Sequence, residues 1–377
     1  MISFLKQLLR PFIEQIHRLV PKRNHAVIYG WPDFEDNTIC LEQGLQDTDL
    51  DQVFLLMTGP QRQPIWQLGG KSRMIRKNSP IGLWRFLTAR YVFFTHPCFA
   101  RHFPSDVVSV NVWHGMPIKR IGKMLQNHEV IRSSHNLATS PFWSDIMTRS
   151  MPAEKPIPNC GLPRNDRLFS DRADVMRKIG VSDARKLIVC LPTYRKSVRG
   201  ELRQDGQEYG NPFELPGIDM MELNDFLKKH HAVLLTKPHP MAMHAGPREW
   251  SHLKIIHESW LHGHALSLYE TIGASDLLIS DISSVVIDYL LLDRPIIHAF
   301  PDIDEYQNSR GFTVEPIEDY FAGAVVSNQQ ELLTALEHEL SGQDPHQEKR
   351  RKLRDLSHTH QDDKSTERLL QEIGLKV

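Results

Sequence analysis

His114 directly follows a β-rich run, VVSVNVW at 107–113, and Gly115 after it permits a sharp turn of the chain. In open parallel sheets, ligands bind beyond the carboxyl ends of the strands, so a histidine at this place is a candidate site residue. Imidazole takes up a proton near neutral pH, which suits a general base that activates a hydroxyl. The chain has 20 histidines, and the alternative for His114 is a buried structural histidine.

Two further donors follow a second β-rich run, HAVLLTK at 231–237. Lys237 ends this run, and His239 stands between two prolines that stiffen the backbone. Cationic donors at a strand end can hold a diphosphate, whereas the alternative is an exposed proline-rich turn. His114 and His239 lie in different halves of the chain, so two sheets that faced each other would direct both into one cleft.

A possible anion site lies in DLLISDISSVVIDYLLLD at 276–293, which combines a buried strand, a short turn and an apolar helical run. Ser283 or Ser284 is a natural N-cap for that helix. The free N–H groups and the positive dipole end of a helix N-terminus attract phosphate, and serine hydroxyls add donors. The alternative is an ordinary N-cap without a ligand.

Arginine and lysine side chains in two other segments are further candidates. PTYRK supplies Arg195 and Lys196 after the run KLIVCL, and SRGF supplies Arg310. Arginine at a strand end suits bidentate phosphate binding, although ordinary surface charge is the alternative. The histidine spacings lack the H-E-x-x-H pattern, and Asp302-Ile-Asp304 is too short a match to indicate a metal, so we expect no catalytic metal and no cofactor.

Composition indicates a globular protein of 377 residues, enough for two domains of roughly 150 residues each. The formal net charge of −1 argues against nucleic acid as a partner. The four cysteines lie far apart and form no C-x-x-C pair, which fits a reducing compartment. Because the N-terminus has no continuous apolar region and no stretch approaches the ~20 apolar residues of a membrane span, we expect a cytoplasmic protein.

Residues 1–23 predict a basic amphipathic helix, which Pro11 is expected to kink or interrupt. Its apolar residues recur at helical spacing and its charges are mostly lysine and arginine. Such a helix can lie in a membrane interface, or it can pack on the protein's own core. The pattern alone favours neither interpretation.

Short β-rich runs alternate with helical stretches along the rest of the chain, which predicts parallel sheets covered on both faces. The predicted helices include 220–230, 284–292 and 329–340, and a break between two domains is expected near 155–180, in EKPIPNCGLPRND. The predicted strands are 25–30, 52–57, 91–96, 107–113, 186–191, 231–237, 253–258, 276–280, 295–300 and 323–327.

Seven segments together resemble the CDP-glycerol glycerophosphotransferase family of teichoic-acid and capsule synthesis, over roughly residues 25–315. In chain order they are PDFEDN (32–37), WHGMPIKRIG (113–122), GLPRND (161–166), PTYR (192–195), KPHP (237–240), DISSVVIDYLLLDRPI (281–296) and DEYQNSRGF (304–312). Seven blocks in the right order are far more specific than any one of them.

The resemblance implies an α/β fold of GT-B type, with two Rossmann-like domains facing a central cleft, here preceded by an N-terminal amphipathic helix. The expected division is a membrane-associating helix 1–23, an acceptor-side domain 24–165, a CDP-donor domain 166–345 and a C-terminal helical segment 346–377. Resemblance further implies catalytic roles for His114 and His239. The implied donor- and phosphate-binding residues are Trp113, Gly115, Lys119, Arg164, Thr193, Tyr194, Arg195, Lys237, Asp281, Ser283, Ser284, Asp288 and Arg310.

The implied reaction is transfer of glycerol phosphate from CDP-glycerol to a hydroxyl of a lipid-linked saccharide or growing polymer, with release of CMP. The protein would work as a peripheral protein at the cytoplasmic face of a bacterial membrane, which it would contact through residues 1–23. The absence of the long N-terminal region of the larger polymerases favours a priming or compact capsule-type transferase. The alternatives are a ribitol-phosphate transferase that uses CDP-ribitol, a nucleotide-sugar glycosyltransferase of the same fold, and a non-catalytic nucleotide-binding membrane module.

Overall fold

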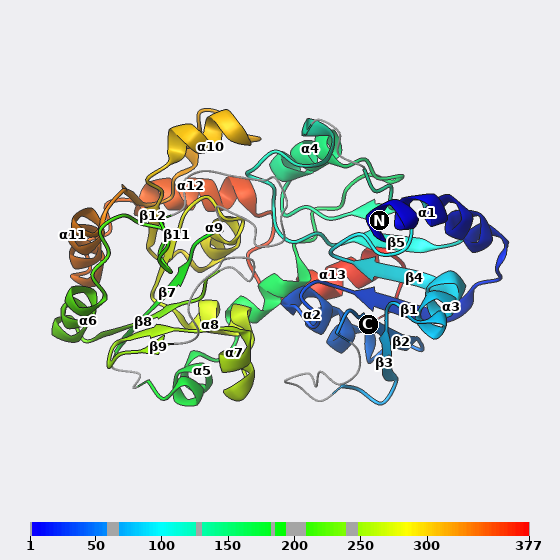
Figure 1. Ribbon diagram of the computed structural model, residues 1–377, viewed down its shortest axis with the longest axis horizontal. Coiled ribbons are helices and arrows are strands. Elements are labelled where there is room, and N and C mark those ends of the chain that lie inside the picture. Colours follow the sequence, from blue (N-terminus) through cyan, green and yellow to red (C-terminus); the bar gives the residue numbers. More distant parts are fainter. Residues whose placement is uncertain are drawn as a thin grey trace. The chain divides into compact units, whose positions relative to one another are not determined.

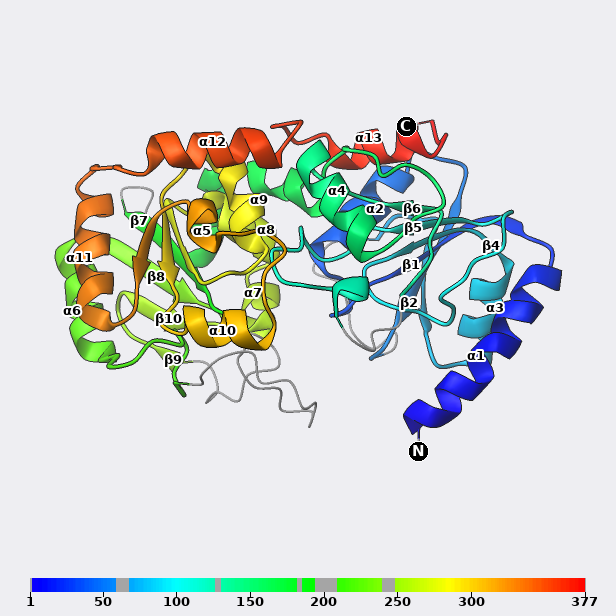
Figure 2. The same cartoon turned by 90° about the horizontal axis from the view of Figure 1, so that it is seen from above.

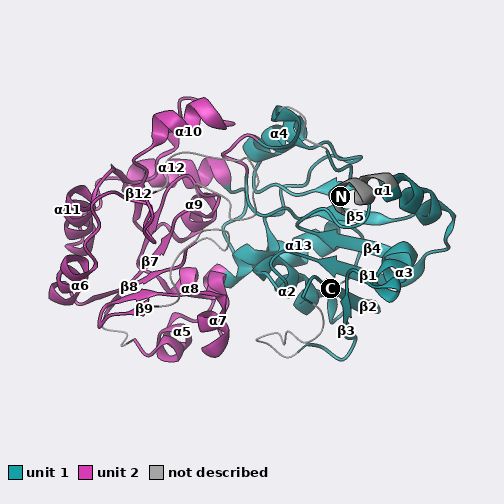
Figure 3. Cartoon of the chain, in the orientation of Figure 1, with its two compact units in different colours: residues 1–116, 121–167, 358–377 teal, residues 117–120, 168–357 magenta. Residues whose placement is uncertain are grey.

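The structure is a computed structural model that describes residues 2–58, 68–125, 130–181, 185–193, 209–238 and 248–376, with side chains from residue 9 onward. The chain forms two compact units (Figure 3): unit 1 comprises 1–116, 121–167 and 358–377, and unit 2 comprises 117–120 and 168–357. The sequence placed the junction between 165 and 166, whereas the units divide after Arg167, and the segment expected as 346–377 is divided after Ser357.

Unit 1 is built on a six-stranded parallel sheet with the order β3-β2-β1-β4-β5-β6. Figure 1 labels β1 to β5 of this sheet. Its strands are β1 (Arg23–Tyr29), β2 (Asp51–Leu56), β3 (Ser72–Arg76), β4 (Ala89–Phe94), β5 (Val108–Asn111) and β6 (His135–Asn136). This is the order of a Rossmann fold, in which strand addition reverses between β1 and β4 and ligands bind at that switch point.

The helices of unit 1 begin at residues suited to capping. Ser79 accepts a hydrogen bond from the backbone N–H of Gly82 at the start of α3, and Ser140 caps α4 in the same way, each followed by proline in the first turn. The helices are α1 (Ile2–Leu19), α2 (Asp36–Leu45), α3 (Pro80–Thr88), η1 (Gly122–Met124), α4 (Pro141–Ser150), η2 (Pro163–Phe169, which runs into unit 2) and α13 (Ser365–Glu372).

Helix α1 continues through Pro11, so the proline does not interrupt it. One face packs on the core of unit 1: Ile13 contacts the apolar cluster of the sheet, and the buried His17 ring lies 4.8 Å from the Phe86 ring of α3. Burial, and then the charge of Lys22, lowers the pKa of His17 to about 3. In two perpendicular views α1 lies alongside α3 (Figures 1 and 2).

Unit 2 contains a seven-stranded sheet with the order β13-β12-β11-β7-β8-β10-β9, in which only β9 is antiparallel to its neighbour. Its strands are β7 (Lys186–Leu191), β8 (Ala232–Thr236), β9 (Arg248–Glu249), β10 (Leu253–Ile255), β11 (Leu277–Ser280), β12 (Ile296–Ala299) and β13 (Ala324–Val326). The parallel strands again follow the Rossmann order, and the switch point lies between β7 and β11.

Both faces of the second sheet are buried, as its parallel strands require. Ile188 of β7 and Leu234 of β8 belong to one apolar cluster, whereas their neighbours Leu187 and Val233 belong to another, and successive side chains of a strand point to opposite faces. The helices of this unit are α5 (Arg172–Ile179), α6 (Met220–Lys229), α7 (Glu258–Gly263), α8 (Leu268–Ala274), α9 (Val285–Tyr289), η3 (Leu290–Leu292), α10 (Ile303–Ser309), η4 (Ile317–Tyr320), α11 (Gln329–Leu340) and α12 (Gln347–Ser357).

The C-terminal segment divides because its two helices are held by different partners. In α12, the buried Arg350 side chain binds Asp293 and Asp344 of unit 2. In α13, the N–H groups of Ser365 and Thr366 donate to the carboxylate of Asp166 in unit 1.

Candidate functional site

His114 lies in a sharp turn beyond the carboxyl end of β5. Trp113 before it has a left-handed backbone with φ 55°, and Gly115 after it has φ 120°, a value that suits glycine. The N–H of Trp113 donates to the side-chain oxygen of Asn111 at 3.2 Å, which holds the start of this turn. The His114 side chain is exposed, whereas the following Met116 is fully buried. The turn therefore presents the imidazole at the sheet edge, as the sequence predicted.

The protonation pattern of His114 follows from its contact with Thr95. Nδ1 of His114 lies 3.4 Å from the backbone carbonyl oxygen of Thr95. A carbonyl oxygen only accepts hydrogen bonds, so this contact requires a proton on Nδ1 and leaves Nε2 as the nitrogen that can take up a proton. Nε2 is thus the atom of His114 suited to act as a general base.

Aromatic rings surround His114 on the edge of unit 1. The His96 ring, which follows β4, stacks on the His114 ring with centroids 4.7 Å apart and an interplanar angle of 13°. The centroids of the Trp113 and His114 rings lie 4.0 Å apart, and the Trp31 ring meets the His96 ring edge-on with centroids 5.7 Å apart. His96 was not among the predicted site residues, although its place at the end of the predicted strand 91–96 was an available signal.

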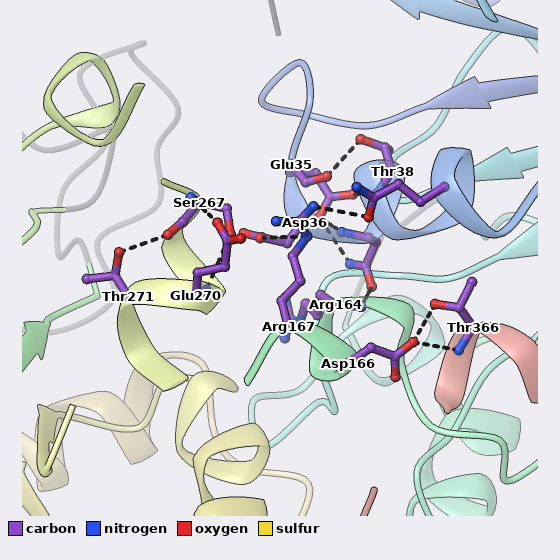
Figure 4. Close-up of polar contacts among 12 residues, drawn as sticks. Glu35, Asp36, Thr38, Arg164, Asp166, Arg167, Ser267, Glu270, Thr271 and Thr366 are labelled. Atoms are coloured by element: carbon purple, nitrogen blue, oxygen red, sulfur yellow. Dashed lines mark hydrogen bonds and ion pairs between the residues drawn. The ribbon is translucent and has the colours of Figure 1, made fainter. Parts of the chain in front are cut away.

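The PDFEDN segment holds the loop that follows β1. Both carboxylate oxygens of Asp33 accept backbone N–H bonds at 2.8 Å, from Met57 and Thr58, beyond the end of β2. Glu35 caps α2 by accepting from the N–H groups of Asn37 and Thr38 (Figure 4). These contacts give the segment a structural role at the switch point of unit 1.

Arg164 of the GLPRND segment is buried in unit 1, and its backbone N–H donates to the side-chain oxygen of Asn37 at 3.1 Å. Burial raises the pKa of Glu35 to about 7, and the charge of Arg164 opposes that rise. Two residues on, Asp166 accepts from the N–H and hydroxyl of Thr366 in α13 (Figure 4). The segment thus connects α2 and α13, a role that the sequence did not reveal.

The switch point of unit 2 is organised by Asp281, which directly follows β11. One carboxylate oxygen of the buried Asp281 accepts from the N–H of Thr193 at 3.1 Å and also from its hydroxyl. The carbonyl of Asp281 accepts from Nδ1 of His298, whose Nε2 accepts from the N–H of Ala322, each at 3.0 Å. An ionised carboxylate has no hydrogen to donate to a phosphate oxygen. The structure therefore indicates that Asp281 holds the loop in which the nucleotide-binding residues were predicted.

The predicted helix N-terminus follows this loop. Ser284 occupies the N-cap position of α9, with Ser283 before it, but no side-chain hydrogen bond from Ser284 caps the helix. Asp288, which the resemblance placed in the donor pocket, is fully buried and accepts a 2.6 Å hydrogen bond from the hydroxyl of Tyr269. Its carboxylate therefore fixes α9 against α8.

Lys237 follows β8 as predicted, and its backbone N–H donates to the Cys190 carbonyl at 2.9 Å. Its Nζ lies 3.3 Å from a carboxylate oxygen of Glu258 in the first turn of α7. Burial alone would raise the pKa of Glu258, but a hydrogen bond from His262 and the charge of Lys237 lower it to about 2. Lys237 thus has an ionised partner at the sheet edge. Tyr194, Arg195 and His239 lie outside the described residues.

Two predicted blocks, distant in sequence, meet within unit 2. Lys119 and Phe312 form an isolated antiparallel bridge, and the N–H of Thr313 donates to the Ile118 carbonyl at 2.8 Å. Arg310 Nε donates to the Arg120 carbonyl at 3.4 Å. The structure therefore brings the predicted residues Lys119 and Arg310 onto adjacent segments.

Among the described residues, no group of three or more His, Cys, Asp or Glu side chains could hold a metal ion. In the part of the chain that was searched, no helix is both long and apolar enough to cross a bilayer.

Two parallel sheets with the Rossmann order, and candidate residues at their carboxyl edges, define a GT-B-like α/β fold. A solved structure of the wall teichoic acid polymerase TagF matches with a TM-score of 0.75 at 19% identity, over 98% of this chain and 96% of that chain. The structure of the S. aureus protein MnaA with UDP matches with a TM-score of 0.52 at 10% identity, over 93% and 96% of the two chains. At these identities the likeness concerns the fold alone.

Residues 12–375 match the family described as CDP-Glycerol:Poly(glycerophosphate) glycerophosphotransferase, and the chain belongs to this family. The resemblance inferred from the seven sequence blocks is thereby confirmed, as is the α/β fold with two parallel sheets.

Curated relatives carry names for both glycerol and ribitol phosphate. The teichoic acid ribitol-phosphate polymerase TarK of Staphylococcus aureus is 27% identical over 239 residues, which are 62% of this chain and 43% of TarK. The teichoic acid ribitol-phosphate primase of Bacillus spizizenii is 26% identical over 289 residues, 70% of this chain and 68% of the primase. The teichoic acid glycerol-phosphate transferase of Staphylococcus aureus is 26% identical over 255 residues, 60% and 61% of the two chains. This chain spans less than half the length of TarK. Relatives of nearly equal identity are named for ribitol phosphate and for glycerol phosphate, so the comparisons establish the family and do not select the polyol.

Proposed function

We propose that this protein is a polyol-phosphate transferase that transfers glycerol phosphate from CDP-glycerol to a hydroxyl of a lipid-linked saccharide or growing polymer. The product would enter a teichoic-acid-like or capsule polymer. Family membership over residues 12–375 supports the reaction class. The observation that carries the proposal is the exposed His114, whose Nδ1 contact with Thr95 leaves Nε2 as a proton acceptor.

In the proposed step, the acceptor oxygen forms a bond to the β-phosphorus of the donor, which carries the glycerol. The bond from that phosphorus to the oxygen bridging it to CMP breaks, and CMP leaves with the electron pair. The acceptor proton passes to Nε2 of His114. Because phosphoryl transfer depends mainly on positioning and charge stabilisation, N–H and cationic donors can serve it.

The donor diphosphate is assigned in this proposal to the edge of unit 2. The two serines before α9 and Lys237 supply hydroxyl, N–H and ammonium donors there, and Thr193, which donates to Asp281, holds the neighbouring loop in place. His239 would join them as a donor to the leaving phosphate. The ionised Glu258 balances part of the Lys237 charge, which favours a site that also releases its product.

The test is CMP release from CDP-glycerol and from CDP-ribitol, with a lipid-linked acceptor, by the wild type and by His114→Ala. His102→Ala is the matched control, because His102 is a half-exposed histidine of unit 1 that contacts Glu14. We expect acceptor-dependent CMP from CDP-glycerol, a roughly 10²–10⁴-fold loss in His114→Ala, and no loss in the control.

Each other outcome identifies a rival. Release of CMP from CDP-ribitol alone would make the protein a ribitol-phosphate transferase. Turnover of a nucleotide sugar to a nucleoside diphosphate would make it a glycosyltransferase. Donor binding without turnover, unchanged in His114→Ala, would make it a non-catalytic module.

We also propose that the outer face of α1 binds an anionic membrane surface, where a lipid-linked acceptor would be found. Leu9, Phe12, Ile16 and Leu19 are 51%, 65%, 38% and 82% exposed, and their spacing places them on one side of the helix. The single acidic residue of α1, Glu14, is occupied by the N–H groups of residues 101 and 102. The neighbouring α3 adds the exposed Ile81 and Trp84.

The charge of this surface fits anionic lipid. The exposed Arg18 and Arg23 flank the apolar face, and the Arg23 guanidinium lies 5.9 Å from the centre of the Trp84 ring. Lys22 instead stabilises the end of α1, because its Nζ donates to the carbonyls of Val20 and Leu87 at 2.9 and 3.0 Å. Apolar side chains with arginines beside them suit the boundary between head groups and acyl chains.

The membrane test is co-sedimentation with phosphatidylglycerol and with phosphatidylcholine vesicles. Burial of a Phe or Leu side chain contributes about 1.5–3 kcal/mol, so Phe12→Ser with Leu19→Ser should weaken binding to anionic vesicles at least tenfold. The matched control, Met221→Ser with Leu356→Ser, removes apolar residues that are 58% and 40% exposed in unit 2. Equal sedimentation of both double variants would refute this part of the proposal.

A further inference from the structure

His96 and His114 come together because their strands are neighbours. β4 and β5 pair in parallel with Phe94 opposite Asn111, and the N–H of Val112 donates to the Phe94 carbonyl at 3.0 Å. The two histidines leave these strands on the same sheet edge, and their rings stack 4.7 Å apart and nearly parallel, at 13°.

Thr95 holds both rings. Its hydroxyl lies 3.0 Å from Nδ1 of His96, and its carbonyl oxygen lies 3.4 Å from Nδ1 of His114. Thr95 itself is fully buried, and its N–H donates to the Tyr29 carbonyl of β1 at 3.1 Å. One residue anchored in the sheet therefore fixes the hydrogen bonding of both histidines.

The surroundings keep the His96 ring neutral. Burial lowers its pKa to about 4, and the nearby positive charge of Lys77 adds to the shift. Lys77 is itself held in place, because its Nζ lies 3.9 Å from the centre of the Tyr29 ring and 3.5 Å from the Pro97 carbonyl. A neutral ring can lie face to face with an imidazole that becomes cationic, whereas a second cation would repel it.

We propose that His96 is a positioning residue for His114: its ring, braced by Thr95 and Trp31, supports one face of the His114 imidazole. This support keeps His114 in the orientation in which Nδ1 donates to Thr95 and Nε2 accepts the proton. The inference rests on the proposed role of His114 as the base. The contact of His114 with Thr95 is long and by itself constrains the ring weakly, and the stacked His96 ring adds a further constraint.

The first readout is the tautomer of His114 in the full chain, measured by long-range ¹H–¹⁵N correlation of histidine-labelled protein and assigned by the signals that His114→Gln removes. We expect the Nδ1–H form in the wild type. His96→Ala should show a mixture of the two tautomers, and His96→Phe, which keeps a flat ring, should retain the Nδ1–H form.

The second readout is the division between kcat and KM in the CMP-release assay. General-base catalysis contributes roughly 10²–10⁴-fold in all, so we expect His96→Ala to lower kcat about tenfold with the donor KM changed less than twofold. His96→Phe should recover most of that loss. The matched control is His135→Phe, since His135 is a buried histidine of unit 1 whose Nδ1 also lies 2.9 Å from the hydroxyl of the preceding residue.

The two readouts separate this inference from the proposed function. If the wild type releases no CMP but His96→Ala still changes the His114 tautomer, the reaction is wrong and the positioning role stands. An unchanged tautomer in His96→Ala overturns the positioning role whatever the activity. The same holds if His135→Phe changes the His114 tautomer as much as His96→Ala does. If His96→Ala fails to fold, the test rests on His96→Phe. A mixture of His114 tautomers in the folded His96→Phe would overturn the proposal that a flat ring at this position is enough to position His114.

Discussion

Acidification is expected to destabilise unit 2 through His298, a buried histidine of β12. Burial lowers its pKa from the ordinary 6.5 to about 4, although its hydrogen bond to the Asp281 carbonyl opposes the shift. The neighbouring charges that act on it are Asp281, which raises the pKa, and Lys349 and His346, which lower it. His298 is therefore neutral in the folded protein at pH 7, and protonation has to break its acceptor bond from the N–H of Ala322.

The direction and the size of the change in the free energy of unfolding follow from proton binding at His298. Between pH 6.5 and 4 the unfolded chain binds a proton at His298 that the folded chain does not, so stability is complete above pH 6.5 and falls as the pH falls. Each pH unit in this window is worth ~1.4 kcal/mol, which gives a loss of about 2 kcal/mol at pH 5 and about 3 kcal/mol at pH 4.

The assay compares urea unfolding at pH 7.5 and pH 5 for the wild type and for His298→Gln. Glutamine offers an NH2 donor group and a carbonyl acceptor and does not titrate, so the variant's loss of stability between the two pH values should be smaller than that of the wild type by about 2 kcal/mol. Other buried histidines, such as His17 and His96, contribute equally to both proteins and cancel. Hydrogen exchange of peptides spanning β11 and β12 assigns the change to unit 2. Equal losses for the two proteins would refute the reasoning.

Two further substitutions test contacts that the sequence did not show. Asp166→Ala removes the acceptor of the Ser365 and Thr366 N–H groups and of the Thr366 hydroxyl. It should lower the free energy of unfolding by about 1–3 kcal/mol, with early hydrogen exchange of α13. Unchanged protection of α13 would contradict the role of Asp166 in holding the start of this helix. Glu258→Gln removes the ionised partner of the buried Lys237. It should lower the free energy of unfolding in urea by about 1–2 kcal/mol, less than for a fully buried pair because Glu258 is partly exposed to solvent. An unchanged unfolding midpoint would show that solvent already screens the pair.

The strands were the most predictable part of the fold. Each of the ten predicted runs overlaps an observed strand, because strands of a parallel sheet that is buried on both faces are continuously apolar in sequence. β3 was missed because its sequence SRMIR is half polar, as its place at the edge of the sheet allows. β6 and β9 were missed because two residues carry no periodicity.

Some site residues could likewise be predicted from the local sequence, whereas others could not. His114 and Lys237 could be found from the rule that ligands bind at strand ends, which needs only the local sequence. The burial of Asp288 could not be foreseen, because VVIDYLLL is apolar on all sides and does not say which face of the helix points inward. The stacking of His96 on His114 depends on β4 and β5 being neighbours, which is a property of the sheet order and of no single segment.

The two units share one strand order, yet their switch points carry different side chains, and this difference separates their chemistry. In unit 1 the loops after β1 and β4 place Trp31 against the neutral His96, beside an imidazole with one nitrogen able to accept a proton. In unit 2 the loops after β7 and β11 are joined by Thr193 and Asp281, which leads the chain into a helix N-terminus. In the proposed reaction, the first edge would remove the proton of the acceptor hydroxyl and the second would bind the diphosphate of the CDP-linked substrate. The same topology thus serves both halves of the proposed reaction, and the residue types after the strands, rather than the fold, decide which half each unit performs.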